Sequence, residues 1–247
     1  MKTINLNLFR LMGAATCALA MLALGVGCAT AQAPASNAVT AIDILLEPDA
    51  TMLKHAEANN ARLLRVYPKG FALDASHRPH ITMLQCFVRT ADLDKVYAAV
   101  GKVLAGVNVN AMKLDAFKYY YIPAGELGVA GIVARPTPEL LKLQADIIAA
   151  VAPFTVKTGP IGAFTAAHDD PKLDVQMIDY VSTFVQKASG ERFNPHVTTG
   201  TAPRKYLDKM LTEPFQPFTF SPAGAAVYQL GPFCTAAKKL KEWYLKR

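Results

Sequence analysis

Two short stretches, Pro79-His80-Ile81-Thr82 and Pro195-His196-Val197-Thr198, decide the fold, because they repeat one pattern at matching places in the two halves of the chain. In a β-strand, residues i and i+2 point to the same face. The histidine and the threonine of each stretch are therefore expected to project together, while the aliphatic residue between them turns into the core. If the two halves pack about a pseudo-twofold axis, the two pairs face each other across one cleft.

The segments around these stretches follow one order twice: strand, helix, short strand, helix, strand. Apolar residues at alternating or helical spacing define them, and Thr137 can cap a helix that begins at Pro138. We expect strands over residues 42–47, 79–88, 112–122, 128–134, 194–199 and 225–230, and helices over 48–64, 92–105, 137–151 and 205–211. Residues 160–193 form an insertion in the second half.

This order predicts an α+β protein with a bilobal, duplicated fold, in which two antiparallel or mixed sheets are flanked by helices around a central cleft. The expected single domain spans residues 41–247, with lobes at about 41–125 and 126–247. An exchange of terminal strands between the lobes is left open.

The strand over residues 112–122 is expected to alternate, with Met112 and Ile122 on its core face. The opposite face then ends in Tyr119 and Tyr121. These two rings could stack a nucleobase if they line the cleft. The alternative is an edge strand covered by the neighbouring lobe.

The first 31 residues resemble a secretory signal. Lys2 and Arg10 precede an apolar run over Leu11–Val26, and Ala29-Thr30-Ala31 provides a small-residue cleavage site. The run is shorter than the ~20 residues that a membrane span needs. We expect a periplasmic or secreted protein with a linker over residues 32–40 and no membrane partner after cleavage; lipidation at Cys28 is the alternative.

Composition describes a folded chain whose charge is concentrated at its ends. Of the 247 residues, 52% are hydrophobic and 18% are charged, which excludes a disordered or low-complexity protein. The formal net charge is +7, but the signal carries two of these charges and the last ten residues carry a net four. The basic tail is expected to be a solvated helix face, so net charge does not argue for an anionic partner.

The remaining motifs are few. Cys86 and Cys234 lie outside the signal and form either a disulfide or two buried thiols. The predicted strands are not followed by a glycine-rich phosphate loop, and the sequence has no CxxC pair. Nucleotide-binding α/β folds and zinc ribbons are therefore unsupported.

The paired His-x-Thr motifs in a duplicated α+β chain resemble the two-histidine (2H) phosphoesterase superfamily, which includes 2′-5′ RNA ligase-like proteins and cyclic nucleotide phosphodiesterases. The resemblance covers residues 41–247, including the closing Ala225–Gly231 strand and the basic stretch that begins at Lys238. It implies a bilobal fold with both motifs in the central cleft and no metal requirement. Four residues carry over by motif: His80, Thr82, His196 and Thr198.

These side chains suit phosphodiester chemistry. Histidine, with an unperturbed pKa near ~6.5, can take a proton from water or deliver one to a leaving oxygen at neutral pH. His80 and His196 are therefore the expected acid–base pair, in an order that the sequence leaves open. Thr82 and Thr198 are expected to donate hydrogen bonds to the phosphate oxygens.

The leading hypothesis is a monomeric, metal-independent phosphoesterase without a cofactor, acting on a 2′,3′-cyclic phosphate or a 2′-5′-linked nucleotide or RNA terminus. The alternatives are RNA 2′-5′ end ligation by the same residues and a non-catalytic nucleotide- or RNA-binding module. A metal-dependent hydrolase that uses His77 with His80 is a further alternative.

Three other side chains have weaker signals. Arg78 could meet a phosphate or could lie in an exposed loop. His168 is expected on an exposed loop of the insertion, and His55 is expected to be structural.

Overall fold

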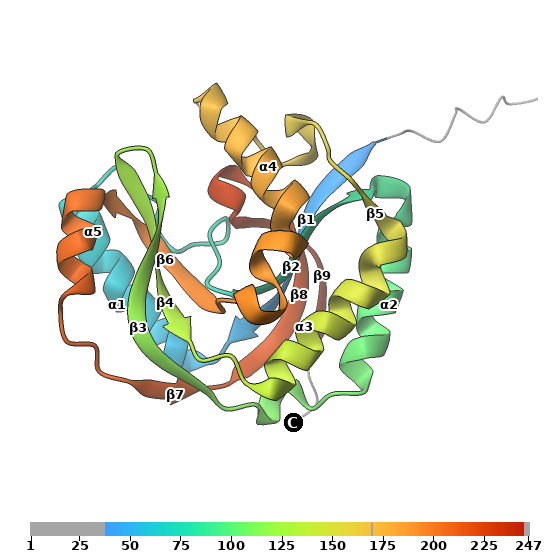
Figure 1. Ribbon diagram of the computed structural model, residues 1–247, viewed down its shortest axis with the longest axis horizontal. Coiled ribbons are helices and arrows are strands. Elements are labelled where there is room, and N and C mark those ends of the chain that lie inside the picture. The colour runs from blue at the N-terminus through green and yellow to red at the C-terminus, as the bar shows by residue number, and fades with distance from the viewer. Residues whose placement is uncertain (1–37, 169, 245–247) are drawn as a thin grey trace, which may run out of the picture. The chain divides into compact units, whose positions relative to one another are not determined.

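A computed structural model describes residues 38–168 and 170–244, so the predicted signal lies outside the described residues. Each predicted helix and strand is present, with its ends shifted by a few residues (Figure 1). The strands are β1 (Val39–Pro48), β2 (Ile81–Arg89), β3 (Leu114–Ala124), β4 (Leu127–Ala134), β5 (Thr155–Val156), β6 (His196–Pro203), β7 (Phe218–Phe220), β8 (Pro222–Leu230) and β9 (Ala236–Tyr244). The helices are α1 (Ala50–Val66), α2 (Leu93–Ala105), α3 (Pro138–Val151), α4 (Pro171–Ala188) and α5 (Arg204–Leu211).

The strands form one antiparallel sheet in the order β7-β3-β4-β6-β2-β1-β8-β9, with β5 paired to β2. The sheet has two arms, β7-β3-β4-β6 and β2-β1-β8-β9. One residue pair, Ile81 opposite Val197, joins them. The α+β class is confirmed, and the two sheets expected from the sequence are arms of one sheet that meet between the two motif strands.

The two halves of the chain exchange their last strands. β3 comes from the first half but pairs with β4 and β7 of the second. β8 and β9 come from the second half but continue the arm that β1 and β2 begin. This exchange brings β2 and β6 together at the centre of the sheet.

The main core lies between one face of the sheet and helices α1, α2 and α3. Alternate residues of β1 enter it, namely Ile42, Ile44 and Leu46, because strand side chains point to opposite faces in turn. Helix α4 packs on the other face, where Met177 and Val181 contact the Phe87 region of the sheet. The insertion therefore places a helix on the side of the sheet that holds the motif residues.

Side-chain caps fix the starts of three helices. The carboxylate of Asp49 accepts hydrogen bonds from the first-turn N–H groups of α1, and Asp170 does the same for α4. The Thr137 hydroxyl accepts from the N–H of Leu140, as predicted for the helix that begins at Pro138. These contacts satisfy N–H groups that have no partner within the helix.

The basic tail is a strand, which corrects the expected helix face. Residues 236–244 pair with β8 as the edge strand β9, and Lys238, Lys239 and Lys241 are exposed on it. Ladder hydrogen bonds to β8 outweigh the helical preference of this lysine-rich segment. Lysines on an edge strand also hinder pairing with other chains.

Cys86 and Cys234 are free thiols, so the structure supports the second of the two alternatives for this pair. Burial raises the pKa of both thiols. Within the described residues, no helix combines the length and the apolar character needed to cross a membrane.

Candidate active site

The four motif residues line one cavity of about 520 Å³, here called the cleft. Ile81 and Val197 are buried opposite each other in the core. The residues that flank them on both strands, His80, Thr82, His196 and Thr198, therefore share the other face. Because antiparallel strands run in opposite directions, each histidine lies on the side of the other strand's threonine. The expected meeting of the two motifs in one cleft is confirmed.

Both ring nitrogens of His80 make polar contacts with oxygen atoms of the protein. Its Nδ1–H donates to the carbonyl of Arg78 at 2.6 Å, and its Nε2 lies 3.2 Å from Oδ2 of Asp43. A carbonyl and a carboxylate both accept hydrogen bonds, so both nitrogens must carry a proton to satisfy these contacts. The ring is buried, with 8% of the residue exposed.

His196 has a different environment. Its Nδ1–H donates to the carbonyl of Asn194 at 2.8 Å, which repeats the contact between His80 and the residue two positions before it. No carboxylate contacts Nε2 among the described residues, and the ring of Tyr120 lies beside the imidazole, with 5.2 Å between centroids. Nε2 is left as an acceptor that faces the cleft.

Asp43 on β1 is a site residue that sequence reasoning missed. It is fully buried, and its Oδ2 accepts hydrogen bonds from Thr82 Oγ1 at 2.9 Å and Gln85 Nε2 at 2.8 Å, in addition to its contact with His80. Its Oδ1 has no hydrogen-bond partner among the described residues. A signal was present: an acidic residue stands between Ile42 and Ile44, which places it on the face of the strand opposite the core.

The pKa values of the two histidines are shifted in opposite directions. Burial lowers the pKa of His80, but the hydrogen bond and charge of Asp43 outweigh it, so the pKa of His80 is raised above its ordinary value. Burial lowers the pKa of His196, and the charge of His80 lowers it further, while the bond to Asn194 opposes the shift. His80 is thus predisposed to be an imidazolium and His196 a neutral imidazole.

Tyr119 and Tyr121 do not line the cleft, which corrects the predicted facing of β3. A bulge between Ala116 and Lys118 shifts the pairing with β4 by one residue and reverses the faces beyond it. Tyr119 packs edge-on against Phe215, and the hydroxyl of Tyr121 donates to Asp208 of α5.

The bulge places Ile122 on the wall of the cleft instead of in the core, and it turns Tyr120 toward His196. Burial raises the pKa of the Tyr120 hydroxyl, although a hydrogen bond with Asn194 opposes this. Tyr120 thus helps to fix the segment that orients His196.

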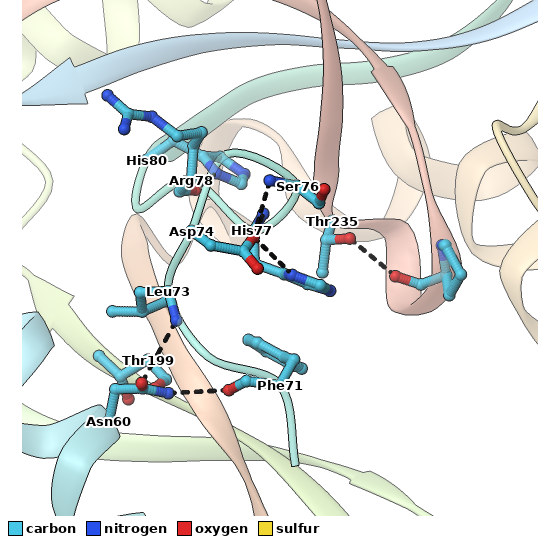
Figure 2. A network of polar contacts seen from close by, with 11 residues as sticks. Asn60, Phe71, Leu73, Asp74, Ser76, His77, Arg78, His80, Thr199 and Thr235 are labelled. Atoms are coloured by element: carbon cyan, nitrogen blue, oxygen red, sulfur yellow. Dashed lines mark hydrogen bonds and ion pairs between the residues drawn. The ribbon is translucent and has the colours of Figure 1, made fainter. Parts of the chain in front are cut away.

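The loop between α1 and β2 forms one wall of the cleft and is held by Asn60 (Figure 2). The Asn60 side chain donates to the carbonyl of Phe71 at 2.9 Å and accepts from the N–H of Leu73 at 3.3 Å. It also donates to the carbonyl of Thr199 on β6 at 2.9 Å. One buried amide therefore ties the loop to the second motif strand.

His77 and Arg78 of the same loop line the cleft. The ring of His77 stacks on Phe71, with 4.6 Å between centroids, and its Nδ1 lies 3.1 Å from Oδ1 of Asp74. Arg78 is exposed, and none of the ion pairs in the described structure includes it. Arg78 also lines a neighbouring pocket that includes Glu47 and Glu242.

Two other histidines lie away from the motif residues. His55 stacks on Phe218 at 3.7 Å between centroids. His168 accepts from the N–H of Asp170 and meets the ring of Phe233 edge-on, so it is half-buried rather than on an exposed loop. Among the described residues, no group of three or more His, Cys, Asp or Glu side chains is arranged to hold a metal ion.

The curled antiparallel sheet and the paired motifs define a protein of the two-histidine phosphoesterase class. A family model described as the 2'-5' RNA ligase superfamily matches residues 53–230, and the chain belongs to this superfamily. The matched region includes both motifs and α4, whereas Asp43 precedes it. Membership supports an enzyme of the phosphoesterase kind.

Solved structures of similar fold come from several organisms. TT0787 of Thermus thermophilus has 16% identity and a TM-score of 0.48, and covers 83% of this chain and 98% of its own. E. coli LigT complexed with NADP+ has 11% identity and a TM-score of 0.43, with 85% and 100% covered. Kluyveromyces marxianus Usb1 has 9% identity and a TM-score of 0.41, with 87% and 100% covered. No curated protein sequence matches the chain.

Proposed function

We propose that this protein hydrolyses a 2′,3′-cyclic phosphate, or a 2′-5′ phosphodiester of a nucleotide or RNA terminus, by acid–base catalysis between two histidines and without a metal ion. The observation that carries the proposal is that the two histidines have opposite hydrogen-bonding roles in the cleft. His80 donates from both nitrogens, one of them toward the buried Asp43 carboxylate, whereas His196 keeps Nε2 as an acceptor in the same cleft. An acid and a base on opposite sides of phosphorus suit in-line displacement.

In the proposed reaction, Nε2 of His196 takes a proton from water as the water oxygen bonds to phosphorus. The bond between phosphorus and one ribose oxygen then breaks, and His80 transfers to that oxygen the Nε2 proton that it shares with Asp43 before the substrate binds. A ring-opened monoester is the product. Asp43 stabilises the imidazolium of His80 before the transfer, and a cyclic substrate needs little further help because ring strain is released.

The two threonines have unequal roles in this proposal. Thr198 lines the cleft, and its hydroxyl has no partner within the described part of the chain, so it can donate to a non-bridging phosphate oxygen. The hydroxyl of Thr82 donates to Asp43 and helps to orient that carboxylate beside His80. Thr82 also lines the cleft and can turn its hydroxyl toward a bound phosphate.

RNA 2′-5′ end ligation is the second candidate, favoured by the name of the matching superfamily. In ligation a 5′-hydroxyl replaces water as the nucleophile on the cyclic phosphate, so His196 would again take the proton and His80 would again protonate the leaving ribose oxygen. The pKa shifts of His80 and His196 suit both nucleophiles equally, so analysis of the products distinguishes hydrolysis from ligation. The residues assigned here all belong to one chain, so we propose that a monomer is active. From the signal predicted over the first 31 residues, we also propose that it acts in the periplasm or outside the cell.

The proposed function predicts turnover in the presence of a chelator. The protein without its first 31 residues is expected to convert a nucleoside 2′,3′-cyclic phosphate into a single monophosphate isomer at the same rate with and without EDTA. Product analysis by anion-exchange chromatography measures this. Loss of the rate in EDTA, restored by a divalent cation, would overturn the metal-free mechanism; 2′-5′ joined products would favour ligation.

Asp43→Asn is expected to lower kcat/KM on the alkaline side of the pH profile by about tenfold. Wild type should show a bell-shaped profile: the acid limb reports His196, which must lose its proton, and the alkaline limb reports His80, which must keep it. Removing the carboxylate charge lowers the pKa of His80, so the alkaline limb should move to lower pH; the acid limb should move less, because the charge of Asp43 is only the smallest contribution to the pKa of His196. Asp146→Asn, on the exposed face of α3, is the matched control. An unshifted alkaline limb in Asp43→Asn would show that Asp43 does not act through His80.

A further inference from the structure

Helix α4 packs on the cleft side of the sheet. Its buried residues Met177 and Val181 belong to a cluster with Phe87 and Phe164. The thiol of Cys234 contacts the carbonyl of Met177 at 4.0 Å, which joins the helix to the loop after β8. The insertion therefore forms one wall of the cleft.

The loop after β8 carries backbone strain at this wall. Phe233 and Cys234 both adopt positive φ, at 58° and 55°, although neither is glycine. Such conformations cost free energy and persist where the surrounding structure fixes them. Here they direct Phe233 into the cleft, where His168 packs against its ring edge-on at 4.6 Å between centroids.

The walls of the cleft away from the four motif residues are largely apolar. Helix α4 contributes Leu173, Val175 and Tyr180, and the loop held by Asn60 contributes Phe71, stacked on His77. Val175 is 67% exposed although it lines the cleft. An apolar wall with an aromatic ring beside a phosphate site is suited to a planar heterocycle.

The small number of cationic side chains in the cleft suits the binding of one phosphate better than the binding of a nucleic-acid strand. Within the described structure, the arginine and lysine side chains that line it are Arg78 and Lys187, and Lys187 pairs with Asp179 at 2.9 Å. Proteins that bind RNA or DNA along the backbone neutralise several phosphates with rows of cationic side chains. Of Arg78 and Lys187, only Arg78 makes no ion pair in the described structure.

We propose that the space between α4 and Phe71 is a base-binding subsite, and that the substrate is a single nucleoside phosphate rather than the end of an RNA strand. The cavity of about 520 Å³ lies within the range of about 300–1,000 Å³ that small-molecule sites occupy. The phosphate lies at the motif residues and the base lies against Val175 and Phe71. This inference rests on the proposed function for the identity of the phosphate site.

Equilibrium binding tests the subsite without requiring turnover. Titration calorimetry compares adenosine 2′-monophosphate with a base-free methyl ribofuranoside 2-phosphate and with a ten-nucleotide RNA that ends in a 2′-phosphate. The nucleotide is expected to bind about tenfold more tightly than the base-free ester. The RNA is expected to bind no more than about threefold more tightly than the nucleotide, with a shallow dependence on salt.

A matched pair of variants locates the subsite on α4. Val175→Asp places a charge on the cleft wall and is expected to weaken nucleotide binding by about tenfold while leaving the base-free ester unaffected. Val185→Asp places the same charge on the same helix at a residue that is 44% exposed and does not line the cleft. It is expected to bind the nucleotide like wild type.

Three results would overturn the subsite: equal affinity for the nucleotide and the base-free ester, equal weakening by both aspartate variants, or RNA binding that is far tighter and falls steeply with salt. The expected binding pattern without hydrolysis of any cyclic phosphate would instead reject the proposed function and leave the subsite supported. Hydrolysis of cyclic nucleotides with no effect of Val175→Asp on binding would reject the subsite alone.

Discussion

His196→Ala is expected to lower kcat/KM for a nucleoside 2′,3′-cyclic phosphate by about 10²- to 10⁴-fold, because it removes the base that accepts the proton of the attacking water. Its Nε2 is the acceptor that faces the cleft, since Nδ1–H donates to Asn194. The acid limb of the pH profile should disappear with the imidazole. Steady-state kinetics across the pH range measures both effects.

His55→Ala is the matched control for this variant. His55 stacks on Phe218, and the structure does not place it among the residues lining the cleft. It is expected to retain the wild-type rate. If His196→Ala kept more than a tenth of that rate while its circular dichroism spectrum stayed native, His196 would not be the base.

The motifs and the order of the elements could be predicted from the sequence because both depend on local patterns. Alternation in β2 and β6 fixes the face on which His80 and His196 lie. The cap at Thr137 is likewise a local signal. These features need no knowledge of which strands pair.

The partners of the motif residues could not be predicted because they depend on register between distant strands. Asp43 reaches His80 only because β1 and β2 pair antiparallel, with Leu45 opposite Thr82. The bulge in β3 reverses the faces of three consecutive tyrosines, so Tyr120 and not Tyr119 or Tyr121 lies beside the site. A one-residue shift in pairing leaves little trace in composition.

The positions of the C-terminal segment and of the insertion also could not be predicted from local sequence patterns. The lysine-rich tail forms β9 because β8 offers it an open edge. The sequence indicates only an insertion over residues 160–193, whereas the structure forms helix α4 there and places it against the motif face of the sheet. Tertiary contacts decide both positions, which is why the apolar wall that α4 adds to the cleft appears only in the structure.

His80→Ala is expected to lower kcat/KM for the same cyclic substrate by about 10²-fold or more, because the ribose oxygen would leave without a proton. Asp43 holds His80 in its charged form, so the variant also leaves a buried carboxylate without its partner and should lower thermal stability. A thermal melt measures that loss, and assays well below the melting temperature keep it apart from the kinetic effect.

The most direct test of the opposed histidine roles compares both alanine variants on two substrates. One is the nucleoside cyclic phosphate, whose leaving oxygen needs a proton, and the other is a p-nitrophenyl ester of the same nucleoside monophosphate, whose leaving group does not. His80→Ala should lose about 10²-fold or more on the first and less than about tenfold on the second, whereas His196→Ala should lose about 10²-fold or more on both. Equal losses for His80→Ala on the two substrates, or the reverse pattern between the two variants, would contradict the assignment of His80 as acid and His196 as base.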